Sequence, residues 1–126
     1  LGLHGQNPDQ VGWPVDPMSA SMEDRLALMF CNDMGDAATS AFMGKLGKDQ
    51  WPACCYSYSD WKAEHLKAVP VTYVHCLRDM ALPPAWQTRF AERLHADRTV
   101  YLDAGHQAMN TRPQALAEIL LAEAGA

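Results

Sequence analysis

The sequence predicts an α/β fold, because two β-rich runs are separated by a helical pattern. The first run surrounds Val71 and Tyr73 after a proline and is typical of a buried strand. The second run is Thr99-Val-Tyr-Leu102. Between them Pro84 is well placed at a helix N-terminus, and apolar residues follow it at four-residue intervals (Trp86, Phe90 and Leu94). A helix of ordinary length between two strands favours a parallel pair.

Each strand leads into a side chain that can take part in catalysis. Asp79 follows the first run, and the second run ends in Asp-Ala-Gly-His106. Parallel strands bring these two residues to the carboxyl edge of one sheet, where open α/β sheets bind ligands. Asp103 is a competitor to Asp79, but it lies only three residues before His106, where we expect it to cap the turn.

The residues around this pair resemble the last third of an α/β-hydrolase, whose triad follows the chain order Ser, Asp or Glu, His. Arg78-Asp-Met-Ala-Leu-Pro-Pro-Ala-Trp-Gln87 is similar to the acid loop and following helix of the esterase/hydroxynitrile-lyase-like branch. Ala104-Gly-His-Gln-Ala-Met-Asn-Thr-Arg-Pro113 is similar to its histidine loop, and Met29-Phe-Cys-Asn-Asp33 to its cap segment. The resemblance covers roughly residues 25–124. It implies the C-terminal part of an α/β-hydrolase parallel sheet with flanking helices, preceded by a mainly helical cap.

Two regions follow from this comparison. Residues 1–68 are expected to form an entry segment and the cap region, and residues 69–126 the C-terminal strands and helices of the core. In the cap, Ser21 predicts a helix start, and Asp33 can cap a second helix that ends near Gly47. The simplest role of the apolar cap residues is core packing. The alternative is that some of them line a substrate pocket. The candidate pocket residues are Phe30, Phe42 and Trp51 from the cap region, and Met80 and Gln107 from the core region.

The nucleophile of the family is missing from this chain. No Gly-x-Ser-x-Gly occurs, and no serine follows a β-run between glycines, as a nucleophile elbow requires. We therefore expect this chain to be the C-terminal portion of a hydrolase. Its expected partners are a complementary N-terminal α/β-hydrolase segment that carries the nucleophile and a small-molecule ester.

The resemblance implies that His106 is the general base and Asp79 the acid that orients it. Taken singly, Asp79 could be a turn former and His106 an ordinary loop histidine. Cyanohydrin lyases of this branch carry a lysine directly after the histidine, where this chain has Gln107. That difference favours a carboxylic ester hydrolase and leaves the ester open. The alternative is an inert remnant that binds a small ligand or a protein.

Composition excludes several other classes. The net charge of −5 and the absence of a Lys/Arg cluster disfavour binding to nucleic acid. No apolar run approaches the roughly 18 residues of a membrane span, and no signal peptide is recognisable. The four cysteines lack metal-like spacing and are expected to be reduced, which favours a cytoplasmic protein. We expect no cofactor and no metal.

Overall fold

The computed structural model describes residues 20–47, 52–60, 62 and 64–125. Strands β1 (Thr72–Cys76) and β2 (Arg98–Leu102) form a parallel two-stranded sheet. Their register runs from Thr72 opposite Arg98 to Cys76 opposite Leu102. The predicted α/β class, both strands and their parallel pairing are confirmed.

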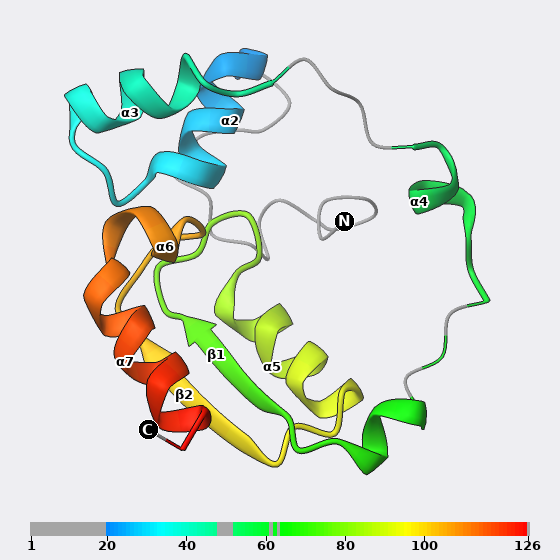
Figure 1. Cartoon of the computed structure of the whole chain (residues 1–126). Helices are drawn as coiled ribbons and strands as arrows, with labels where there is room; N and C mark the ends of the chain where they lie inside the picture. Colours follow the sequence, from blue (N-terminus) through cyan, green and yellow to red (C-terminus); the bar gives the residue numbers. More distant parts are fainter. Residues whose placement is uncertain (1–19, 48–51, 61, 63, 126) are drawn as a thin grey trace.

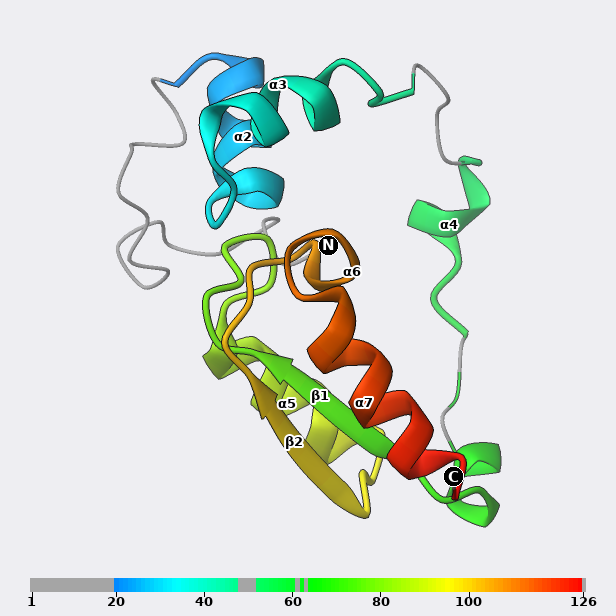
Figure 2. The same ribbon diagram turned by 60° about the vertical axis from the view of Figure 1, so that its left-hand side comes forward.

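Helices α5 (Pro84–Arg93) and α7 (Pro113–Glu123) lie on opposite sides of this sheet (Figures 1 and 2). Under α7, a small core forms around Leu102, Ala104 and Ala108, with Leu116 and Ile119 packed against it. The proline predicted in the first turn of α5 is confirmed, and α7 also has a proline in its first turn. The fixed φ of proline and its missing N–H suit that position, where no intrahelical bond is lost.

The face of α5 that meets the sheet differs from the prediction. Trp86, Phe90 and Leu94, which form the predicted apolar stripe, are half-buried, whereas the fully buried residues of α5 are Gln87 and Ala91. Gln87 faces the sheet because its amide group hydrogen-bonds to the backbone at the end of β1. Trp86 and Phe90 each precede one of these buried residues by one position, and their ring centroids are 6.3 Å apart.

Helices α2 (Met22–Cys31) and α3 (Asp36–Met43) form a separate layer. In both views this layer lies beyond the carboxyl ends of the two strands (Figures 1 and 2). The Ser21 cap is confirmed, since its side chain accepts a hydrogen bond from the Asp24 amide. The predicted bounds of α3 are wrong: its N-cap is Gly35 rather than Asp33, and its C-cap is Gly44.

The remaining described elements are short. They are helix α4 (Cys54–Ser57), the 3₁₀ helix η1 (Glu64–Ala68) and helix α6 (Ala108–Thr111). The sequence Thr111-Arg-Pro-Gln114 predicts a capping box at the start of α7. The box is absent, because Thr111 belongs to α6 and its hydroxyl donates to the Gln107 carbonyl. No helix within the described ranges has the length and apolar character to cross a membrane. The entry segment, predicted at residues 1 to about 20, lies outside the described residues up to position 19.

Candidate active site

Asp79 and His106 come together at the carboxyl edge of the sheet. Asp79 lies in the loop after β1 (residues 77–83, the acid loop), and His106 in the loop after β2 (residues 103–107, the histidine loop). The distance from His106 Nδ1 to Asp79 Oδ2 is 2.8 Å. Parallel strands with the observed register end side by side, which explains how residues 27 positions apart meet.

The Asp79 carboxylate is fixed by its own loop. Its other oxygen, Oδ1, accepts hydrogen bonds from the backbone N–H groups of Ala81 and Leu82, both at 2.8 Å. The residue is 5% exposed. Asp79 is thus a turn former as well, but the turn occupies one oxygen and leaves Oδ2 to accept from the imidazole.

The imidazole of His106 is half-buried, with 36% of its side chain exposed. With Nδ1 donating to Asp79, the neutral ring carries its lone pair on Nε2. Within the described ranges, no hydrogen bond to Nε2 is found. A nitrogen in this state can accept a proton from a hydroxyl group that is brought within hydrogen-bond distance.

Asp103 does not compete for the imidazole. Its side chain is 72% exposed and pairs with Arg78, at 2.7 Å from Asp103 Oδ1 to Arg78 Nε. Arg78 therefore links the two loops at the surface, and its backbone N–H also bonds to the Ala104 carbonyl at 3.0 Å. These contacts join the acid loop to the histidine loop directly.

Gln87 is a supporting residue that the sequence reasoning missed. Its Oε1 accepts from the Cys76 N–H at 2.8 Å, and its Nε2 donates to the carbonyls of Cys76 and Leu82 at 2.8 and 2.7 Å. Gln87 is 2% exposed. It therefore ties the end of β1 to the far end of the acid loop. A glutamine interrupting the apolar spacing of the helix was the signal that could have revealed it.

The five predicted pocket residues have different surroundings. Phe30 lies over the imidazole, with ring centroids of Phe30 and His106 5.3 Å apart. Met80 and Gln107 are half-buried and follow Asp79 and His106 in the chain. Trp51 lies outside the described residues. A role of these residues in holding substrate stays a prediction.

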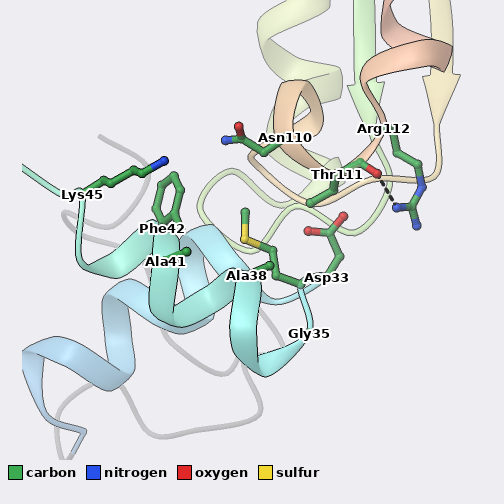
Figure 3. Close-up of a pocket in the computed structure, with 10 residues that line it drawn as sticks. Asp33, Gly35, Ala38, Ala41, Phe42, Lys45, Asn110, Thr111 and Arg112 are labelled. Atoms are coloured by element: carbon green, nitrogen blue, oxygen red, sulfur yellow. Dashed lines mark hydrogen bonds between the residues drawn. The ribbon is translucent and has the colours of Figure 1, made fainter.

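Phe42 lines a cavity of about 410 Å³ between α3 and the segment from α6 to Arg112. Figure 3 shows Phe42 and Lys45 on one wall and Asn110, Thr111 and Arg112 facing them, with the Asp33 carboxyl group between. Neither His106 nor Asp79 lines this cavity. The cavity thus neighbours the Asp–His pair through Phe42, whose ring is 6.3 Å from that of Phe30.

Two thiols near this region are poor nucleophiles at neutral pH. Burial raises the pKa of the Cys76 thiol above its ordinary value of 9.0, and the Asp79 and Asp33 carboxylates raise it further. Burial and Asp33 likewise raise the pKa of the Cys31 thiol. Both cysteines are free, as is the exposed Cys54.

The described part of the chain contains no group of three or more His, Cys, Asp or Glu side chains arranged to hold a metal ion.

Comparison with protein-family models and with curated protein sequences finds no match. The case for a function therefore depends on the residues and geometry of the site itself.

Proposed function

We propose that this chain supplies the acid and the base of a serine-type carboxylic ester hydrolase. In this proposal His106 is the general base and Asp79 orients it. The serine nucleophile comes from a complementary N-terminal segment or chain. The observation that carries the proposal is the 2.8 Å contact between His106 Nδ1 and Asp79 Oδ2 at the carboxyl edge of a parallel sheet.

Each side chain has a defined role in the proposed reaction. His106 Nε2 takes the proton of the serine hydroxyl as the serine attacks the ester carbonyl, and then returns it to the leaving alcohol. Asp79 keeps the proton of the neutral ring on Nδ1 and stabilises the imidazolium that forms. The half-exposed imidazole is compatible with this role, because Nε2 must be reachable from outside the chain.

The need for a complementary segment is supported by the incomplete core. Among the described residues, no large side chain is less than 2% exposed, and the buried hydrophobic residues are small apart from Leu102. Large apolar side chains such as Leu77, Tyr101 and Met109 are 46–64% exposed. A finished domain of this length normally buries its large apolar residues more completely.

The free edge of β1 gives a second reason. The Val71 carbonyl and the Leu77 N–H point toward β2 and the residues that extend it. Because backbone groups alternate along a strand, those of Thr72 and Val74 point to the opposite edge. No strand from the described residues pairs there. On the same edge, the backbone groups of Cys76 are bonded to Gln87, so the unpaired part runs along Thr72 and Val74. Unpaired edges of this kind favour addition of a further strand.

The test is hydrolysis of an activated aryl ester by the 126-residue chain alone and by the assembly that contains a Gly-x-Ser-x-Gly segment. We expect the chain alone to be inactive, because it lacks the nucleophile and an oxyanion hole. We expect the assembly to be active and to lose on the order of 10³–10⁴-fold in kcat with Asp79→Asn. Turnover by the isolated chain that disappears in His106→Ala would contradict the proposed division of the active site.

A second candidate is an inert hydrolase remnant that binds a small ligand. The observation in its favour is the cavity of about 410 Å³ beside α3, which is lined by Phe42 and by the charged groups of Lys45, Arg112 and Asp33. This candidate predicts that no assembly containing the chain hydrolyses esters. The ligand-binding candidate would be supported if small carboxylate compounds shift the NMR signals of Lys45 and Arg112 in the chain alone.

A further inference from the structure

We propose that Asn32 and Asp33, the two residues after α2, form a clamp that positions the Asp79–His106 pair. This inference depends on the proposed function for its catalytic meaning, but its structural claim stands separately. Both residues lie between the two helices of the α2–α3 layer. Each contacts the residue immediately before one member of the pair. They are positioning residues and do not touch a reacting atom.

Asp33 holds the histidine loop. Its Oδ2 accepts a hydrogen bond from the backbone N–H of Gly105 at 2.7 Å. Hydrogen bonds to a carboxylate are shorter and stronger than neutral ones. The bond spans 72 positions of sequence and holds the peptide unit between Ala104 and Gly105, one residue before His106. The other oxygen, Oδ1, is buried and has no hydrogen-bond partner among the described residues.

Asn32 holds the acid loop in the same manner. Its Nδ2 donates to the backbone carbonyl of Arg78 at 2.6 Å, directly before Asp79. Two adjacent side chains thus grip two loops that follow different strands. The distance between those loops decides whether the carboxylate reaches the imidazole. The contacts of Arg78 with Ala104 and Asp103 also join the loops, so the clamp adds to an existing link.

Gly105 is the residue that permits this close approach. A Cβ atom added there would lie 2.5 Å from Asp33 Oδ1 and 2.7 Å from Asn32 Oδ1. Both distances are below 3.0 Å, so the clamp or the loop would have to move. A side chain at position 105 would therefore displace the Asn32 and Asp33 side chains from their present positions.

Phe30 connects α2 to the imidazole itself. It lies in the last turn of α2, two residues before the clamp, and its ring centroid is 5.3 Å from that of His106. The α2–α3 layer therefore contacts the pair at the ring and at both preceding residues. A shift of this layer would change the orientation of the imidazole.

The test uses NMR of the whole chain and needs no enzymatic activity. The ¹⁵N signals of the His106 ring report which nitrogen carries the proton, and amide exchange reports the hydrogen bond of Gly105. In the wild-type chain we expect the Nδ1–H form and a protected Gly105 amide. In Asp33→Ala we expect exchange at Gly105 to be roughly 10- to 100-fold faster. We also expect a mixture of the two ring forms.

Asp33→Asn should restore both signals, because an amide oxygen can still accept from Gly105 while the charge is lost. The matched control is Asp36→Ala, at an exposed aspartate in the first turn of α3, which should leave both signals unchanged. Asn32→Ala and Gly105→Ala provide independent routes if Asp33→Ala does not fold. Both should mix the ring forms of His106.

Unchanged ring and amide signals in folded Asp33→Ala would overturn the clamp, as would unchanged ring signals in Asn32→Ala and Gly105→Ala. The clamp would also be overturned if Asp33→Ala changes the ring and amide signals and Asp33→Asn does not restore them. Failure of the proposed function has a different signature. In that case the variants give the NMR changes expected for the clamp, while the assembly with a nucleophile segment does not hydrolyse esters.

Discussion

Replacing Gln87 by leucine should destabilise the chain strongly, although neither residue is charged. Gln87 is 2% exposed and makes three hydrogen bonds to backbone groups of Cys76 and Leu82. Leucine has a similar volume, so packing changes little and the hydrogen bonds are the main loss. Each backbone group left without a partner costs about 1–3 kcal/mol when buried, and these groups are partly buried.

We therefore expect the free energy of unfolding to fall by about 2–4 kcal/mol, out of about 5–15 kcal/mol for a typical domain. Urea unfolding followed by circular dichroism measures this, and the midpoint should fall by roughly 1–2 M. Gln114→Leu is the matched control, because Gln114 is exposed in the first turn of α7. A Gln87→Leu chain within about 0.5 kcal/mol of the wild type would refute the role assigned to the buried amide.

Three further predictions follow from the site. In Asp79→Ala, the His106 ring should lose its preference for the Nδ1–H form; retention of that preference in the ¹⁵N spectrum would contradict the observed hydrogen bond. A thiol reagent at neutral pH should label Cys54 faster than Cys31 and Cys76, whose raised pKa values reduce the thiolate fraction; equal rates in peptide mapping would argue against this difference. Because these two folded-state pKa values lie above the ordinary 9.0, the unfolded chain loses its thiol protons first as the pH rises. The free energy of unfolding in urea should therefore be lower at pH 10 than at pH 7, and an equal or higher value at pH 10 would oppose the assignment.

The strands, α5 and the Asp79–His106 contact could be predicted from the sequence because their signals are local. A β-rich run ending in a polar loop, a proline that starts a helix and a second β-rich run define a strand–helix–strand unit. The parallel register then brings the two loops together. In this part of the chain, residues near in sequence carry enough information to place the site.

The clamp could not be predicted, because its partners lie far away in sequence. The buried glutamine was missed although its partners are near in sequence. Asp33 was expected to cap α3, which its type and position favour, but its carboxylate instead bonds to Gly105. Gln87 was hidden within an apolar pattern, and its burial depends on backbone groups at the end of β1. Helix patterns identify apolar faces well, but they do not show whether a polar residue will be buried against backbone groups of another element.

Fluorophosphonate labelling of the assembly that contains this chain, with mass spectrometry to locate the modified serine, tests whether His106 activates a nucleophile from another segment. We expect a label on a Gly-x-Ser-x-Gly serine outside the 126 residues, and we expect it to be lost in His106→Ala. The label should be retained in His95→Asn, which alters an exposed histidine at a left-handed backbone position that asparagine tolerates. A label on a serine of this chain, or one that persists in His106→Ala, would contradict the claim that His106 activates a nucleophile supplied by another segment.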